Sequence, residues 1–383
     1  MIDFDALANP GIRGLRAYDP GHDLVALRRA HADGALVELG SNENPYGPSP
    51  AAKRAVLETL NQLHRYPDPL GGDLKRALAA RHGVDTTQLV LGNGSHELLM
   101  QFAQVFAGPE REVVASQFGF AVYALAAQAA GAPLRIAPAF AREAAMPRGH
   151  DLDAVAAAIS PRTALVHLAN PNNPTGTWFG ADAFAAFMAR VPESVIVVVD
   201  EAYAEFADAP DYASALALQP RHPNLVVTRT FSKAHALAGL RVGYAVAHPD
   251  CIAVLERVRE SFNVNAAGLA AAVASLGDEA HLRWSLARNA EQRAALADAL
   301  RERGGFVHPS LTNFLLVEFG PEAARIEAGL LRQGVVLRPM AGYGLPGCLR
   351  ITVGDASENR RLLSALGTIV GEPSKLGSTG AGA

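Results

Sequence analysis

The stretch "SVIVVVD", residues 194–200, is a run of apolar residues that ends in an acid. It shows no alternation of apolar and polar residues, which is typical of a central strand that is covered on both faces of its sheet. Further strand-like runs each precede a helix-like or glycine-containing segment: "QLVLGN" at 88–93, "EVVAS" at 112–116, "TALVHLAN" at 163–170 and "NLVVTRT" at 224–230. This order predicts βαβ units around a mostly parallel central sheet flanked by helices, and therefore an α/β fold.

The C-terminal part of the chain has a different pattern. A long helical pattern at 279–303 leads to apolar runs at 305–319, 334–340 and 348–354, which predict a smaller α+β domain. We expect an N-terminal arm at 1–45 that joins this domain, a large domain at 46–278 and the small domain at 279–370. The Gly- and Ser-rich end, 371–383, predicts a disordered tail.

Composition narrows the possible functions. The 383 residues are 49% hydrophobic and 19% charged, which is ordinary for a globular protein. A formal net charge of −4, without basic clusters interleaved with aromatic residues, argues against a nucleic-acid partner. No signal peptide or apolar run of about 18 residues is present, so no membrane span is expected. Cys251 and Cys348 lie far apart without a CxxC pattern, so we expect no metal site and a reducing, cytoplasmic location.

One lysine stands out. Among 34 Lys and Arg residues, lysine occurs only at positions 53, 75, 233 and 375. Lys233 lies in "VVTRTFSKAHALAGLRVGY", residues 226–244, among small and apolar side chains. A lysine is commonly a surface residue. Because this chain usually carries arginine where a permanent positive charge suffices, Lys233 indicates a need for an amine that can lose its proton.

Other polar groups follow the predicted strands. Asp200 ends the buried run and could be a ligand or the N-cap of the next helix. Asn170 opens "NPNNPTG", residues 170–176, which by local chemistry is a turn. "GNGSHELL", residues 92–99, is a glycine turn that opens a helix at Ser95 and could present backbone N–H groups to an anion.

Taken together, these groups match one cofactor. Pyridoxal phosphate needs a lysine for a Schiff base, a carboxylate for its ring nitrogen and a cradle for its phosphate. Lys233 and Asp200 supply the first two, and Tyr203 adds a phenol. Ser232 and Arg241 can add a hydroxyl and a planar guanidinium to the phosphate cradle.

From "GLRAYDPG" to "LRITVGDASENRRLL", the chain resembles the fold-type I pyridoxal-phosphate aminotransferases, and among them most the histidinol-phosphate aminotransferases. The motifs that carry the resemblance are "NENPYGPSP", "RYPDP", "GNGSHELL", "NPNNPTG", "VVVDEAY", "TFSKAHALAGLRVGY" and "LRPMAGYGLPGCLRITVG".

The resemblance implies a role for each matching residue. Lys233 holds the cofactor and then moves the proton of the substrate α-carbon, while Asp200 pairs with the pyridine nitrogen. The remaining cofactor contacts are Asn170 and Tyr203 at the phenolic oxygen, Gly94, Ser95, His96, Ser232 and Arg241 at the phosphate, and Phe118 stacked on the ring. His96 and Phe118 depart from the residues common in the family, which are an acid or amide and a tyrosine.

The resemblance also implies substrate contacts and a partner. Arg350 receives a substrate carboxylate, Arg338 and Tyr18 lie near the substrate phosphate, and Asn42 lies at the mouth of the site. Tyr66 reaches the cofactor phosphate of a second subunit, which implies a homodimer.

The function that follows is reversible transamination of L-histidinol phosphate with 2-oxoglutarate, giving imidazole-acetol phosphate and L-glutamate in histidine biosynthesis. An aromatic amino-acid aminotransferase remains an alternative, because an imidazole and a phenyl ring can share one pocket. A decarboxylase of phosphorylated amino acids and a non-catalytic cofactor-binding module are further alternatives.

Overall fold

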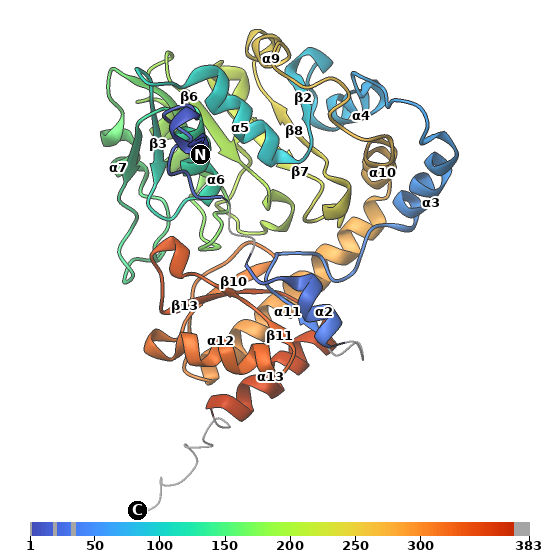
Figure 1. Ribbon diagram of the computed structural model, residues 1–383, viewed down its shortest axis with the longest axis vertical. Coiled ribbons are helices and arrows are strands. Elements are labelled where there is room, and N and C mark those ends of the chain that lie inside the picture. The colour runs from blue at the N-terminus through green and yellow to red at the C-terminus, as the bar shows by residue number, and fades with distance from the viewer. Residues whose placement is uncertain (1, 18–20, 32–35, 371–383) are drawn as a thin grey trace, which may run out of the picture.

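The computed structural model describes residues 2–17, 21–31 and 36–370 of the chain. Its largest element is a seven-stranded sheet in the upper part of Figure 1. In spatial order the strands are β2 (Leu89–Gly92), β8 (Gly243–Val246), β7 (Leu225–Thr230), β6 (Ile196–Asp200), β5 (Thr163–Ala169), β3 (Glu112–Ser116) and β4 (Leu134–Ala137). β8 runs antiparallel to both of its neighbours, β2 and β7, and the other six strands all run in the same direction. The prediction of a mostly parallel sheet is confirmed.

The apolar run at 194–200 forms β6, and both of its faces are buried. Val198 packs in one apolar cluster with the helices α5 (Ser95–Phe106) and α6 (Ala121–Ala129). Val197 and Val199 point to the opposite face and pack in a second cluster with α7 (Leu152–Ala158) and α8 (Ala181–Met188). Helices on both faces explain why β6 has no polar residue before Asp200.

A smaller antiparallel sheet lies in the lower part of Figure 1. Its strands, in spatial order, are β12 (Arg338–Pro339), β13 (Cys348–Thr352), β10 (Phe314–Glu318) and β9 (Phe306–Val307). The helices that accompany it are α11 (Glu279–Glu302), α12 (Ala323–Arg332) and α13 (Ala356–Val370). Nearby, β1 (Val37–Glu38) pairs in parallel with β11 (Val335–Val336), which ties the N-terminal part of the chain to this region. The exact domain boundaries stay a prediction, and the expected tail lies outside the described residues.

The remaining helices are α1 (Phe4–Leu7), α2 (Leu24–Ala30), α3 (Pro50–Thr59), α4 (Gly72–His82), α9 (Pro249–Leu255) and α10 (Ala266–Gly277). Of these, α3, α4 and α10 gather beside the β2 edge of the large sheet (Figure 1). Within the described parts of the chain, none of the helices is both long and apolar enough to cross a membrane.

Candidate active site

A cavity of about 330 Å³ opens at the carboxyl ends of β5, β6 and β7. Its wall also includes residues of the N-terminal segment and of the small sheet. The predicted site residues in the wall are Asn42, Ser95, His96, Asp200, Tyr203, Ser232, Lys233, Arg241, Arg338 and Arg350. Residues from distant parts of the chain thus meet where a parallel sheet usually binds its ligands.

Lys233 lies just beyond the end of β7. Its Nζ donates hydrogen bonds to the carbonyl oxygens of Ser41 at 3.1 Å and Asn42 at 3.2 Å. Burial, followed by the positive charge of Arg350, lowers the pKa of Lys233 from 10.5 to about 8. Most of this amine is still protonated at pH 7, but its neutral fraction is far larger than that of an ordinary lysine, and the neutral form is the one that can accept a proton.

Asp200 ends β6, and its side chain is 6% exposed. Its Oδ2 accepts from the Tyr123 hydroxyl at 3.3 Å, and its Oδ1 accepts from Thr228 Oγ1 at 3.3 Å. Burial raises the pKa of Asp200 from 3.8 to about 6, although both hydrogen bonds oppose the shift. The carboxylate therefore faces the cavity with donors on the protein side, and a cationic partner in the cavity would stabilise its ionised form.

Tyr203 and Asn42 form a second polar pair in the wall. Asn42 Nδ2 donates to the Tyr203 hydroxyl at 2.9 Å, and the Tyr203 ring packs edge-on against Phe314 at 5.2 Å. Burial raises the pKa of Tyr203, so the phenol stays protonated. Asn42 has a left-handed backbone with a φ of 55°, a conformation that asparagine tolerates better than most residues.

The N-terminus of α5 forms an anion cradle. The cap residue Gly94 has a φ of 79° and no side chain to satisfy the first N–H groups of the helix. A Cβ atom at Gly94 would lie 2.4 Å from Nη2 of Arg241, so glycine is what lets this guanidinium approach the helix. Arg241 Nη1 also donates to Ser232 Oγ at 3.3 Å. The backbone N–H groups at the N-terminus of α5, its helix dipole, a guanidinium and a hydroxyl together suit a phosphate.

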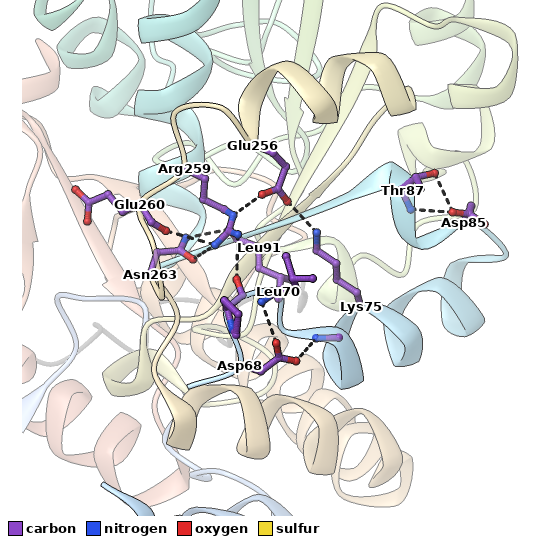
Figure 2. A network of polar contacts seen from close by, with 12 residues as sticks. Asp68, Leu70, Lys75, Asp85, Thr87, Leu91, Glu256, Arg259, Glu260 and Asn263 are labelled. Atoms are coloured by element: carbon purple, nitrogen blue, oxygen red, sulfur yellow. Dashed lines mark hydrogen bonds and ion pairs between the residues drawn. The ribbon is translucent and has the colours of Figure 1, made fainter. Parts of the chain in front are cut away.

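A polar network lies beside the turn between β2 and α5, and Figure 2 shows Leu91, Arg259 and Asn263 among its members. Asn263 Nδ2 donates to the Leu91 carbonyl at 3.1 Å and to Glu97 Oε2 at 2.8 Å, and Glu97 also accepts from the Asn93 backbone. Arg259 Nη1 donates to Asn263 Oδ1 at 2.9 Å. These contacts fix the turn between β2 and α5, which sets the direction of the helix N-terminus.

Arg350 and Arg338 face each other across β13 and β12. Arg350 is buried and donates to Asn173 Oδ1 at 2.7 Å and to the Gly40 carbonyl at 2.8 Å. Both arginines line the cavity, which gives one wall two permanent positive charges. This wall suits ligands that end in a carboxylate or phosphate.

The model of the family "Aminotransferase class I and II" matches residues 35–366. The chain belongs to this family. Histidinol-phosphate aminotransferase 2 of Pseudomonas aeruginosa is 47% identical over 372 residues, covering 97% of this chain and 99% of the relative. Histidinol-phosphate aminotransferase 1 of Nitrosococcus oceani is 45% identical over 369 residues, covering 96% of this chain and 98% of the relative.

A solved structure, that of histidinol-phosphate aminotransferase from Sinorhizobium meliloti in complex with pyridoxal-5'-phosphate, superposes with a TM-score of 0.85. It is 30% identical and covers 95% of this chain and 97% of its own. The fold-type I architecture that the sequence motifs implied is confirmed for this aminotransferase.

Asn170 lies elsewhere than the sequence analysis expected. Its Nδ2 donates to the Phe179 carbonyl at 3.2 Å and its Oδ1 accepts from the Phe179 backbone at 3.1 Å, so both ends of the amide serve the local fold. Asn173, three residues later in the same motif, lines the cavity instead. The amide of this motif that lines the cavity of the aminotransferase is therefore Asn173 and not Asn170.

The predicted aromatic contacts also differ in placement. Phe118 is buried against Leu316, Met340 and Leu345, whereas Phe120, two residues on, lines the cavity. Tyr66 is 82% exposed and stacks on Phe262, with ring centroids 4.6 Å apart. Tyr18 lies outside the described residues.

Sequence reasoning missed Tyr123 and Thr228, which contact Asp200. Thr228 is the direct neighbour of Asp200 in the β6–β7 register, so the alignment of the two predicted strands could have found it. Tyr123 lies on α6, and no local pattern indicates which helical side chain reaches over the sheet. Over the described ranges, no group of three His, Cys, Asp or Glu residues could hold a metal ion.

Proposed function

We propose that this aminotransferase catalyses the pyridoxal-phosphate-dependent transamination of L-histidinol phosphate with 2-oxoglutarate. The products are imidazole-acetol phosphate and L-glutamate, and the step belongs to histidine biosynthesis. The observation that carries the proposal is that Lys233 and Asp200 line one cavity together with the anion cradle of α5. Relatives named histidinol-phosphate aminotransferase, up to 47% identical over nearly the whole chain, support the choice of substrate.

The residues of the cavity fit the cofactor. The cradle of Gly94, Ser95, His96, Ser232 and Arg241 would hold its phosphate. Asp200 would face its ring nitrogen, because within the described residue ranges the side-chain hydrogen bonds of this buried carboxylate come from hydroxyl groups and none from a cation. Asn173 and Tyr203 would reach its phenolic oxygen, and Phe120 offers an aromatic wall. When bound, the cofactor supplies an electron sink for the bond that breaks at the substrate α-carbon.

Lys233 performs the proton transfers. Its amine has a pKa of about 8 and can therefore take the α-proton and return it. General acid–base catalysis is most effective when the pKa of the catalytic group lies near the working pH. The carbonyl oxygens of Ser41 and Asn42 hold Nζ in the cavity. Arg350 orients the substrate, and its own position is fixed by Asn173 and Gly40.

Arg338 and Arg350 allow one pocket to serve both substrates. Histidinol phosphate ends in a phosphate monoester, whereas 2-oxoglutarate and glutamate carry two carboxylates. Each of these ligands presents an anion to a wall that carries two guanidinium groups.

The proposal includes a homodimer. Five large apolar side chains on α3 and the following segment have exposed fractions of 50% to 82%. They form an exposed strip of Leu57, Leu60, Leu63, Tyr66 and Leu70. Such a strip suits a protein–protein interface. In such a dimer, Tyr66 would reach the cofactor phosphate of the other subunit, as the family resemblance implies.

A donor panel tests the proposed substrate. We expect histidinol phosphate to exceed phenylalanine in kcat/KM with 2-oxoglutarate as acceptor. Arg338→Ala should lower the value for histidinol phosphate by about 10- to 100-fold, the effect of losing a charge-assisted hydrogen bond, and lower that for phenylalanine much less. Arg332→Ala, an exposed arginine at the end of α12, is the control.

Two outcomes would replace the proposal. A wide preference for phenylalanine would indicate an aromatic aminotransferase. Release of carbon dioxide from a phosphorylated amino acid without 2-oxoglutarate would indicate a decarboxylase.

A further inference from the structure

Tyr123 is a buried phenol beside the carboxylate on which the proposed cofactor depends. It lies on α6 and is 1% exposed. Its hydroxyl donates to Asp200 Oδ2 at 3.3 Å. The other carboxylate oxygen, Oδ1, accepts from the hydroxyl of Thr228. The two oxygens of Asp200 thus each have one hydroxyl donor.

Neighbouring rings hold Tyr123 in place. The imidazole of His167 lies parallel to the phenol ring, with centroids 4.8 Å apart and an interplanar angle of 3°. Phe120 contacts the same ring edge-on at 6.0 Å. His167 is 1% exposed, and neither of its ring nitrogens has a hydrogen-bond partner in the described part of the chain. The stack therefore fixes the plane of Tyr123 without competing for its hydroxyl.

In the contact between Tyr123 and Asp200, the phenol always donates and the carboxylate always accepts. Burial and the nearby charge of Asp200 raise the pKa of Tyr123 well above its usual value, so the phenol keeps its proton and acts as a donor. Burial of His167 lowers its pKa to about 3, so the imidazole adds no charge. A donor that cannot ionise favours the charged form of a buried carboxylate. Phenylalanine would fill the same space without this effect.

We propose that Tyr123, clamped by His167, is a positioning residue that keeps Asp200 ionised and aimed into the cavity, where it meets the ring nitrogen of the cofactor. The inference rests on the proposed function only in that it requires pyridoxal phosphate as the cofactor. Other charged or titratable groups near Asp200 are Glu201, which is paired with Arg229, and the cavity residues Lys233 and Tyr203.

The test compares Tyr123→Phe with Tyr244→Phe. Tyr244 is also a buried tyrosine, but its hydroxyl pairs with His82 at 2.8 Å. In cofactor-free protein, thermal unfolding is measured from pH 4 to pH 8. Asp200 has a higher pKa in the folded state than in the unfolded state, so its contribution to stability falls as the pH rises from 3.8 to about 6.

Loss of the Tyr123 donor should raise the folded-state pKa of Asp200 by about one unit, so that stability continues to fall up to a pH about one unit higher than in the wild type. The Tm deficit of Tyr123→Phe should therefore be small at pH 4 and largest above pH 7. The deficit of Tyr244→Phe should not follow this profile.

Cofactor affinity gives a second readout. Titration with pyridoxal phosphate should show about tenfold weaker binding for Tyr123→Phe, and the loss should disappear in the Asp200→Asn background, where no charge needs the donor. An equal loss in both backgrounds, or a Tm deficit that does not change with pH, would overturn the proposal.

Poor folding of Tyr123→Phe is also informative. If an unsupported charge on Asp200 causes it, Asp200→Asn should restore folding to the double variant. A double variant that also fails to fold would show that Tyr123 serves packing alone, against the proposal. Rejection of histidinol phosphate as a donor would leave these readouts intact, so the two proposals fail separately.

Discussion

Replacing the lysine of the cavity should stabilise the cofactor-free protein. Burial and the charge of Arg350 lower the pKa of Lys233 from 10.5 to about 8, so the folded state resists protonation of this amine. At about 1.4 kcal/mol per pH unit, the protonated amine costs at most about 3.5 kcal/mol of folding free energy. Lys233→Met removes this cost and keeps an apolar chain of similar length.

Part of the gain is offset. The variant loses the two hydrogen bonds from Nζ to the carbonyl oxygens of Ser41 and Asn42, which together contribute about 1–2 kcal/mol. The Asn42 carbonyl still accepts from Asn313 Nδ2 at 3.0 Å, so it does not become unpaired. We therefore expect a net gain of about 2 kcal/mol in the free energy of unfolding at pH 7.

The way in which this gain in stability changes with pH follows from the direction of the pKa shift of Lys233. The folded state holds this proton less tightly than the unfolded state, so the cost is fully present below pH 8 and disappears as the pH rises through 10.5. Urea unfolding of cofactor-free wild type and Lys233→Met, at fixed protein concentration, should show a gain at pH 7 that shrinks by pH 9.5. Lys53→Met, at an exposed lysine on α3, should change stability by less than about 0.5 kcal/mol at either pH. A Lys233→Met variant less stable than wild type at pH 7, or a gain that grows with pH, would refute the reasoning.

Two other variants separate structural from ligand-facing roles. Asn173→Ala should lower kcat/KM by about tenfold or more, because the cavity loses this amide and Arg350 loses one of its acceptors. Asn170→Ala should instead act mainly on stability and lower the free energy of unfolding by about 1–3 kcal/mol, because the Phe179 backbone loses both partners. Equal effects of the two on both quantities would contradict the reassignment. Leu63→Arg should shift the protein from dimer to monomer in sedimentation, while Ile136→Arg, an exposed apolar position on the opposite edge strand β4, should not. Retention of the dimer by Leu63→Arg would remove the exposed strip as the interface.

Much of the architecture could be predicted from the sequence because it depends on local pattern. The unbroken apolar run of β6 is sufficient to predict a strand buried on both faces. The polar residue that ends such a strand, Asp200, is then expected at the carboxyl edge of the sheet, where the cavity lies. Lys233 could be singled out because lysine is rare in this chain.

The rest depends on how side chains are aimed, which local pattern does not determine. The motif "NPNNPTG" contains several asparagines, and only the folded turn shows that Asn173 faces the cavity while Asn170 binds the Phe179 backbone. The same holds for Phe118 and Phe120, which are separated by a single glycine but lie in different environments. The contact of Tyr123 with Asp200 joins a helix to a strand across the sheet, so no spacing in the sequence indicates it.

The most direct test of the account is to locate the covalent attachment of the cofactor. The protein would be loaded with pyridoxal phosphate, reduced with borohydride, digested and analysed by peptide mass spectrometry. Because lysine occurs only at positions 53, 75, 233 and 375, each possible site falls in a distinct part of the sequence. The account predicts the phosphopyridoxyl group on Lys233 and its loss in Lys233→Met. Stoichiometric labelling of another lysine, or no labelling of the wild type, would contradict it.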